Sequence, residues 1–406
     1  MLPPSCLSDG GWALDALRRR PYDALQPAVA AMSNHSAQRY RRIGELCSDD
    51  ESWRWVWRPR EASRCSRFSV PSRAELCRRF SGRRVLLYGD SLTQQHTASL
   101  VSLLGGPVEA RPPEPCRLSR TLRKLQCVRA CPGGAALVCH RFGYGLMTHG
   151  ATDGASPPRA PHGCRVNATA LTTEAAFPPA CLQTFDAVLI GAWAHWAGVD
   201  GAWGLEACLR RARGKEGQQQ HAHSASNAPR IAQAWVRHLF NRTAFDAAAF
   251  LQSGVVAPSA HATGTAARRP RVFFVTAAPG VPPPDVLAPD PPSGATRIPT
   301  AAPPTQRRPS PSREDFGVGA FRAPRNGPHA WAEAWRGAAT SPFNHHMVFA
   351  LNDATRAAAT AHGLELLDLE GAMLARVDGH RVDRLHYCLP GPPDFLAYAL
   401  AATVDW

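Results

Sequence analysis

The stretch Arg84–Leu92 reads RVLLYGDSL, and the interpretation of the fold starts from it. An apolar run of strand-forming residues stops at Gly-Asp-Ser, and the spacing of Leu100, Leu103 and Leu104 beyond it is helical. The sequence therefore predicts a buried strand, a sharp turn and a helix that begins near Ser91. A helix N-terminus offers unpaired backbone N–H groups and a positive dipole end, which favour negative charge. The alternative is an ordinary capping residue, because Ser and Asp are both favoured at N-caps.

Three later apolar runs predict further core strands, with helical patterns between them. The runs are 185–190, 271–277 and 364–369, and another strand is expected within 136–147. Strands that alternate with helices indicate a mainly parallel sheet covered on both faces. The predicted fold class is therefore α/β, a three-layer α/β/α sandwich with long surface loops rich in Pro, Ala and Arg.

The 406 residues suffice for one large domain with insertions. We divide the chain into a weakly ordered N-terminal segment at 1–46, a Trp/Cys-rich subdomain at 47–80 that packs on the main domain, and the main domain at 81–406. Two stretches of the main domain, 209–229 and 279–325, are expected to be flexible loops. Their composition cannot bury enough apolar surface to fold compactly.

The formal net charge of +14 raises the question of a nucleic-acid partner. Lys124 and Lys215 are the only lysines, so nearly all the positive charge is arginine, scattered along a chain rich in Ala and Pro. We find no recognisable nucleic-acid module and no basic stripe interleaved with aromatic residues. We therefore expect no nucleic-acid partner.

Twelve cysteines indicate an oxidising compartment, and Asn-x-Ser/Thr triplets at Asn34, Asn167 and Asn241 agree with a glycoprotein of the secretory pathway. However, residues 1–32 contain no apolar run long enough for a signal peptide or membrane anchor, and no transmembrane segment is expected elsewhere. Either an N-terminal anchor is missing from this sequence or the inferred compartment is wrong.

Cys116, Cys127, Cys131 and Cys139 are close enough together in sequence to consider zinc. The Cys127-x3-Cys131 spacing is looser than that of the usual paired knuckles. Disulfides are the preferred interpretation, and no metal is expected. Their pairing cannot be deduced from the sequence.

A second motif, Val382–Asp394, reads VDRLHYCLPGPPD and follows the last predicted strand. A serine becomes a good nucleophile when a base takes its proton, and a histidine is a dependable base when a carboxylate orients it. Asp383 and His386 would supply both functions for Ser91. Asp-x-x-His alone also occurs as a surface ion pair or cap. Together the motifs are those of an SGNH-type serine esterase or acyltransferase, whose triad gathers at strand ends, and 81–406 is then its catalytic domain.

Other site candidates follow from position in the predicted sheet. Gly143 and Gly145 allow close backbone approach, so their N–H groups, with that of Ser91, are candidates for the oxyanion hole. Asp90, within the first motif, is a candidate substrate contact. His195 and Trp196 directly follow a strand end and are candidate substrate contacts as well, although a histidine beside tryptophans is usually a packed residue.

Trp55 and Trp57 alternate with arginines in an extended segment. Aromatic faces stack on sugar rings and guanidinium groups bind hydroxyls, so the segment could line a carbohydrate groove. The alternative is a disulfide-stapled lid whose tryptophans pack on the main domain.

The chain resembles the trichome birefringence-like polysaccharide O-acetyltransferases, also called the PC-esterase group. The resemblance rests on YGDSL at Tyr88–Leu92, on Asp383–Asp394, on WRWVWRP at Trp53–Pro59 with Cys65, and on His195-Trp196. It implies an enzyme of the Golgi lumen that forms an acyl-serine and passes acetyl to a glycan hydroxyl. Two features differ from the family. The chain has Gly191–Ala194 where members carry an asparagine, and it lacks their N-terminal anchor.

The resulting hypothesis is an O-acetyltransferase with Ser91 as nucleophile, His386 as base and Asp383 as its orienting acid. Its partners are a carbohydrate acceptor and an acyl donor; the donor is a co-substrate, with acetyl-CoA as one candidate, and no cofactor is expected. An acetyl esterase with the same triad and a non-catalytic glycan-binding protein of the same fold are the two alternatives.

Overall fold

The computed structural model describes a little over half of the chain. The described residues are 5–15, 17–22, 52–66, 68–117, 125–143, 178–191, 196, 205–206, 208–209, 228–256, 269–277, 347–374, 386–387 and 389–404. The predicted loop at 279–325 lies outside them, as does nearly all of the one at 209–229.

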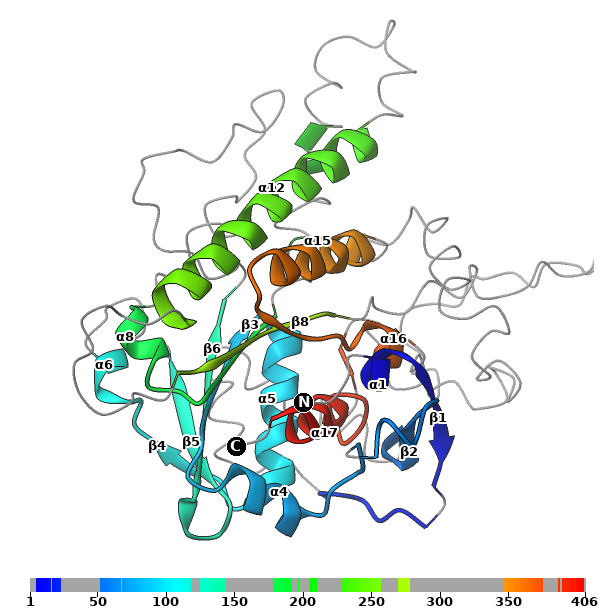
Figure 1. The fold of residues 1–406 in the computed structure, drawn as a ribbon, viewed down its shortest axis with the longest axis vertical. Helices are drawn as coiled ribbons and strands as arrows, with labels where there is room; N and C mark the ends of the chain where they lie inside the picture. Colours follow the sequence, from blue (N-terminus) through cyan, green and yellow to red (C-terminus); the bar gives the residue numbers. More distant parts are fainter. Residues whose placement is uncertain are drawn as a thin grey trace, which may run out of the picture.

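Seven strands form the central sheet, in the order β4-β5-β6-β3-β7-β8-β9 (Figure 1). Five of them, β6, β3, β7, β8 and β9, are parallel, whereas β5 runs antiparallel to β6 and β4 antiparallel to β5. The prediction of an α/β fold with a mostly parallel sheet is confirmed. The strands are β3 (Arg84–Gly89), β4 (Val108–Ala110), β5 (Gln126–Ala130), β6 (Ala136–Phe142), β7 (Ala187–Gly191), β8 (Arg271–Val275) and β9 (Glu365–Leu367).

The order of the strands places β3 at a reversal of chain direction. After β3 the chain forms β4, β5 and β6 on one side of it and then crosses to β7 on the other side, so the connections that follow β3 and β7 lead in opposite directions across the sheet. In open α/β sheets, such a switch point leaves a crevice at the carboxyl ends of the strands, where ligands bind. The Gly-Asp-Ser turn follows β3 directly, so it lies at this crevice.

Helices cover both faces of the sheet, which gives three layers (Figure 1). Successive strand residues point to opposite faces. Accordingly Val85 and Leu87 of β3 pack in the core beneath α5 and α17, and Leu86 and Tyr88 pack in the core beneath α12 and α15. The helices of these elements are α4 (Arg73–Phe80), α5 (Ser91–Leu104), α6 (Glu114–Arg117), α8 (Pro179–Leu182), α12 (Ala228–Leu251), α15 (Met347–Ala361), α16 (Glu370–Leu374) and α17 (Asp394–Thr403).

The N-terminal residues are ordered where the structure describes them. The short helix α1 (Ser5–Ser8) leads into β1 (Gly10–Leu14), which pairs antiparallel with β2 (Trp55–Pro59). The Trp12 indole N–H donates to the Ala372 carbonyl oxygen at 2.7 Å. This part shares one continuous core with α5 and α17. Within the segment 1–46, the structure thus describes residues 5–15 and 17–22 packed on the main domain.

Four disulfides link the described elements: Cys6–Cys65, Cys77–Cys131, Cys116–Cys181 and Cys127–Cys139. All four cysteines for which the sequence left zinc open are thus disulfide-bonded. Among the described residues, no group of His, Cys, Asp and Glu side chains is arranged to hold a metal ion. Within the same ranges, no helix has both the length and the hydropathy needed to cross a bilayer.

Candidate active site

Ser91 and His386, which lie 295 positions apart in sequence, meet in the folded chain. The Oγ of Ser91 and the Nε2 of His386 are 2.8 Å apart, within hydrogen-bond reach. Both residues are half-buried, so the pair is packed on one side and accessible on the other. The sequence motifs predicted this meeting of nucleophile and base.

Ser91 is the first residue of α5, and Asp90 caps that helix. The Asp90 carboxylate accepts a hydrogen bond from the Leu92 N–H at 3.0 Å, and the residue is only 1% exposed. Its side chain is therefore occupied with the helix start and lies below the surface. Asp90 is thus a capping residue of α5, and its role as a substrate contact stays a prediction.

Gly89 allows the ends of β3 and β7 to approach each other closely. A Cβ at this position would lie 1.5 Å from the carbonyl oxygen of Gly191, so only glycine fits. That carbonyl accepts the backbone N–H of Asp90 at 3.3 Å and the hydroxyl of Thr93. The glycine of the Gly-Asp-Ser motif thus joins the start of α5 to the switch point of the sheet.

Gln95, one helical turn after Ser91, holds the segment that carries His386. Its side chain is completely buried, and it makes two hydrogen bonds to the backbone of Tyr387. The Nε2 donates to the Tyr387 carbonyl at 2.8 Å, and the Oε1 accepts the Tyr387 N–H at 3.0 Å. The helix that presents the nucleophile therefore also fixes the residue next to the base.

Two further contacts join α5 to the C-terminal motif. The hydroxyl of Ser99 donates to the Asp394 carboxylate at 2.6 Å, and so does that of Tyr22 at 2.8 Å. The Nδ1 of His96 lies 3.3 Å from the Pro393 carbonyl oxygen. Burial raises the pKa of the Asp394 carboxyl, which is 1% exposed. Asp394 is therefore an anchor for the start of α17.

Sequence reasoning missed Gln95, Ser99 and Asp394 as positioning residues. The available signal was the helical spacing: Gln95 and Ser99 lie four and eight positions after Ser91 on the predicted helix. Polar side chains on a buried helix face need hydrogen-bond partners. The backbone and side chains of the C-terminal motif at 382–394 provide them.

Three predicted site residues, Asp383, His195 and Gly145, lie outside the described residues. The acid member of the triad and the histidine after β7 stay predictions. The structure thus supplies the geometry of a serine and a histidine within hydrogen-bond distance of each other.

Other predicted site residues are engaged elsewhere. The backbone N–H of Gly143 donates to the Gly89 carbonyl at 2.9 Å, so it extends the pairing of β6 with β3 and is not assigned to the oxyanion hole. Trp196 has no exposed surface and its ring packs edge-on against Phe240, so it lies in the core, and its role as a substrate contact stays a prediction.

Trp55 and Trp57 of the N-terminal subdomain differ in how deeply they are buried. Trp57 is 4% exposed, donates its indole N–H to the Cys6 carbonyl at 2.9 Å and packs against Phe395 of α17. The contacts of Trp57 are those of a residue packed between the N-terminal segment and α17. Trp55 is half-buried.

The position of Ser91 on α5 also defines the local electrostatics. A helix of 14 residues concentrates a partial positive charge on its first N–H groups, and the Ser91 N–H is among them. Negative charge that develops next to Ser91 Oγ would form at this positive end. The arrangement therefore suits attack by the serine on a carbonyl group, with the oxygen of that group becoming an anion.

The chain matches no protein-family model, and no curated protein is significantly similar to it. The function of the site is therefore argued from its geometry and from the sequence motifs.

Proposed function

We propose that this chain is a serine-dependent O-acetyltransferase that moves an acetyl group to a carbohydrate hydroxyl. The observation that carries the proposal is the 2.8 Å distance between Ser91 Oγ and His386 Nε2 at the start of α5. The proposed nucleophile follows the central strand and the proposed base lies near the C-terminus. This placement fits a fold of the SGNH type. The proposal that the acceptor is a carbohydrate and the transferred group is acetyl rests on the motifs that resemble those of the PC-esterase group.

The first half-reaction acylates the serine. Ser91 Oγ attacks the acetyl carbonyl carbon, and His386 Nε2 takes the hydroxyl proton as the new C–O bond forms. The carbonyl oxygen becomes an oxyanion beside the Ser91 N–H and the positive end of α5. The intermediate collapses when the bond to the donor breaks, and His386 gives its proton to the leaving group.

The second half-reaction reverses these roles. A sugar hydroxyl attacks the acetyl carbon of the acyl-serine, and His386 takes the proton of that hydroxyl. The bond from carbon to Ser91 Oγ then breaks, and His386 returns the proton to the serine. The products are the O-acetylated sugar and the free enzyme, so no oxidant, reductant or metal is consumed. Asp383 would orient His386 and stabilise its protonated form in both steps.

The donor is a co-substrate, and acetyl-CoA is one chemical form that it could take. The compartment that fits is an oxidising one of the secretory pathway, such as the Golgi lumen, because the described cysteines are disulfide-bonded. Water in place of the sugar hydroxyl would make the same site an acetyl esterase. The half-burial of Ser91 leaves room for either acceptor.

Labelling with a fluorophosphonate tests the nucleophile directly. The wild-type chain should be labelled at Ser91, Ser91→Ala should lose all label, and His386→Gln should be labelled at least about 100-fold more slowly, because the base is missing. Ser81→Ala removes an exposed serine of the same domain and should label normally. A folded wild-type protein that takes up no label would instead support a non-catalytic glycan-binding protein.

Product analysis then separates the transferase from the esterase. The enzyme is incubated with radiolabelled acetyl donor in the presence and absence of a mixture of neutral and acidic oligosaccharides. The transferase yields acetylated oligosaccharide that disappears in Ser91→Ala. If labelled acetate is the sole product in both samples, the acceptor is water and the transferase assignment is wrong.

A further inference from the structure

A hollow of about 370 Å³ lies at the end of the sheet opposite to Ser91. Four arginines from three separate parts of the chain line it, with a single carboxylate and a threonine hydroxyl among them. These residues are Arg84, Arg111, Arg117, Arg129, Glu114 and Thr184. Arg84 begins β3 and Ser91 follows the end of it, so the hollow is about 20 Å from the nucleophile along the strand.

The sheet directs two of the guanidinium groups to the same face. Arg84 of β3 and Arg129 of β5 both stand opposite Leu137 of β6, so the three form one row across adjacent strands. Residues in such a row point to the same side of the sheet. Leu137 packs in the core beneath α12 and α15. Arg84 and Arg129 therefore emerge on that face, next to α6.

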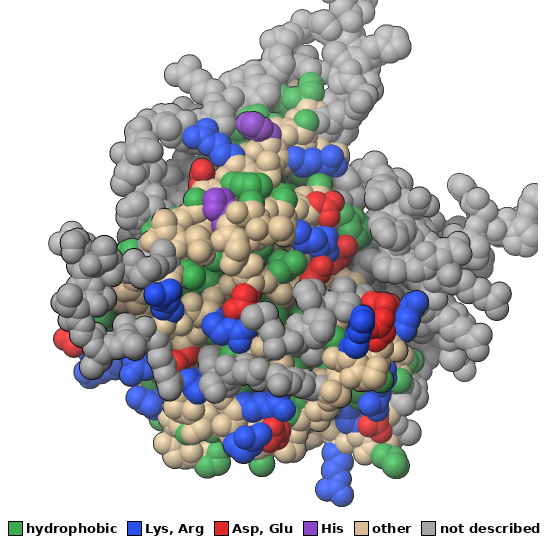
Figure 2. Space-filling model, viewed as in Figure 1, with side chains coloured by type: hydrophobic (Ala, Val, Ile, Leu, Met, Phe, Trp, Pro, Cys, Tyr) green, Lys and Arg blue, Asp and Glu red, His purple; other side chains and the backbone are tan. Residues whose placement is uncertain are grey.

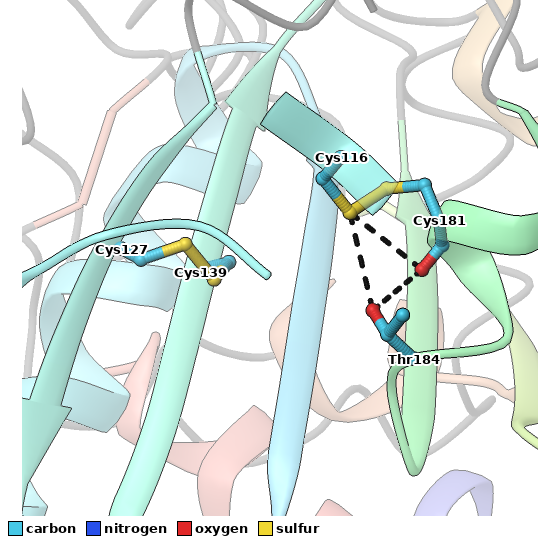
Figure 3. The surroundings of a disulfide bond; sticks show 5 residues. All are labelled: Cys116, Cys127, Cys139, Cys181 and Thr184. Atoms are coloured by element: carbon cyan, nitrogen blue, oxygen red, sulfur yellow. Dashed lines mark hydrogen bonds between the residues drawn. A yellow bond between two sulfur atoms is a disulfide. The ribbon is translucent and has the colours of Figure 1, made fainter. Parts of the chain in front are cut away.

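A disulfide holds the wall of the hollow (Figure 3). Cys116 of α6 is bonded to Cys181 of α8, and Thr184 donates its hydroxyl to the Cys181 carbonyl at 2.7 Å. Glu114 and Arg117 lie on the same short helix as Cys116. The disulfide thus joins α6 to α8 at the wall of the hollow, while the arginine side chains that line it are exposed.

The charges of this hollow are not balanced within the described chain. There, the side chains of Arg84, Arg111 and Arg117 form no ion pair, and Arg129 donates to the Gly134 carbonyl at 3.2 Å. Other arginines of the fold pair with carboxylates, as Arg356 does with Asp368 at 2.9 Å. Figure 2 shows basic side chains gathered at the edge of the molecule that carries α6 and β4.

Converging guanidinium groups repel one another unless an anion lies between them, and their planar donors match the oxygens of carboxylate and sulfate groups. We infer that this hollow is a binding site for carboxylate or sulfate groups of an acidic polysaccharide, remote from Ser91. That the anion is carried by a glycan rests on the proposed function; that the site binds oxyanions rests on its own residues. The site would retain an acidic acceptor chain on the enzyme while another part of the chain reaches the nucleophile.

Direct binding measurements test this inference without any catalysis. Fluorescently labelled oligogalacturonate supplies carboxylates, oligosaccharides from dextran sulfate supply sulfates, and neutral dextran oligosaccharides are the uncharged control. Each is titrated into the Ser91→Ala protein at about 0.1 M salt, where long-range attraction between exposed charges is largely screened. We expect one or both acidic probes to bind and the neutral probe not to bind, and the better of the two identifies the preferred anion.

Arginine variants test whether the acidic probe binds in the hollow. Arg84→Gln combined with Arg117→Gln should weaken binding of the acidic probe at least about tenfold, because two charge-assisted contacts are lost. The matched control is Arg237→Gln combined with Arg242→Gln, which removes the same charge from exposed positions of α12 and should change affinity by less than about twofold. Equal losses in both pairs would mean attraction to the net charge alone, and the inference would be wrong.

Two more results separate this inference from neighbouring ones. Binding of a single-stranded DNA oligonucleotide as tightly as the acidic glycan, lost in the same variants, would overturn the glycan assignment. Fluorophosphonate labelling of the hollow variants, with Ser91 intact, should proceed at the wild-type rate. If labelling of Ser91 fails in every protein while the acidic probe still binds, the proposed function is wrong and the anion site stands.

Discussion

Replacing Gln95 by alanine should release His386 from the nucleophile. Gln95 is fully buried and Tyr387 is 2% exposed, so the alanine variant would remove two buried hydrogen bonds to the Tyr387 backbone. The loss of a buried hydrogen bond that leaves a polar group unsatisfied costs about 1–3 kcal/mol. The segment can avoid this cost by moving toward water, and His386 is the adjacent residue.

The expected result is a loss of reactivity without a matching loss of fold. Even about 2 kcal/mol, if it appears as displacement of the base, lowers the rate of acylation about 30-fold. The assay is the rate of fluorophosphonate labelling of Ser91, measured beside the thermal unfolding midpoint. Thr97→Val is the matched control, because the Thr97 hydroxyl donates within α5 to the Thr93 carbonyl and touches no part of the His386 segment.

Gln95→Glu adds a signature that general destabilisation would not produce. A glutamate keeps the acceptor for the Tyr387 N–H, but it can donate to the Tyr387 carbonyl only when protonated. The labelling rate of this variant, divided by the wild-type rate, should therefore rise as the pH falls from about 8 to about 5.5. If Gln95→Ala labels at the wild-type rate, or if this ratio does not change with pH, the positioning role is refuted.

The remaining predictions concern folding. Gly89→Ala should destabilise the chain by about 3 kcal/mol or more, because the new Cβ would overlap the Gly191 carbonyl oxygen, whereas Gly11→Ala, with open space around it, should leave the unfolding midpoint nearly unchanged. Burial lowers the pKa of His140 from 6.5 to about 3. The unfolded chain therefore binds the extra proton first, and acidification from about pH 7 to about pH 5 should cost the wild type about 2 kcal/mol that His140→Leu does not lose. Denaturant unfolding at both pH values measures this, and parallel losses in the two proteins would contradict it. Burial raises the pKa of Asp394, so ionisation of this carboxyl destabilises the folded chain as the pH rises above its unfolded pKa. The unfolding free energy of Asp394→Asn, relative to that of the wild type, should therefore increase between about pH 4 and about pH 7. A difference that stays constant with pH would contradict this.

Local patterns in the sequence determined most of the sheet. The apolar runs at 84–89, 185–190, 271–277 and 364–369 correspond to β3, β7, β8 and β9, because a strand buried on both faces must be apolar at nearly every position. The glycine, aspartate and serine after β3 predicted the turn and the start of α5 for the same reason: caps and turns depend on neighbours in the chain. The edge strand β4 carried no comparable signal, since its three residues are largely exposed.

The tertiary structure decided what each site residue contacts. The contacts of Gly143 and Trp196 could not be predicted from the sequence, because an N–H group and an indole ring are defined by their partners, and those partners lie on other elements. Gln95 shows the converse, since its importance depends on a backbone 292 positions away. The sequence by itself determined that a serine would begin a helix after the central strand and that a histidine would be available near the C-terminus. Only the packing of α5 against the segment at 386–394 brought the two within 2.8 Å, because long-range distances follow from how buried surfaces fit together and not from spacing along the chain.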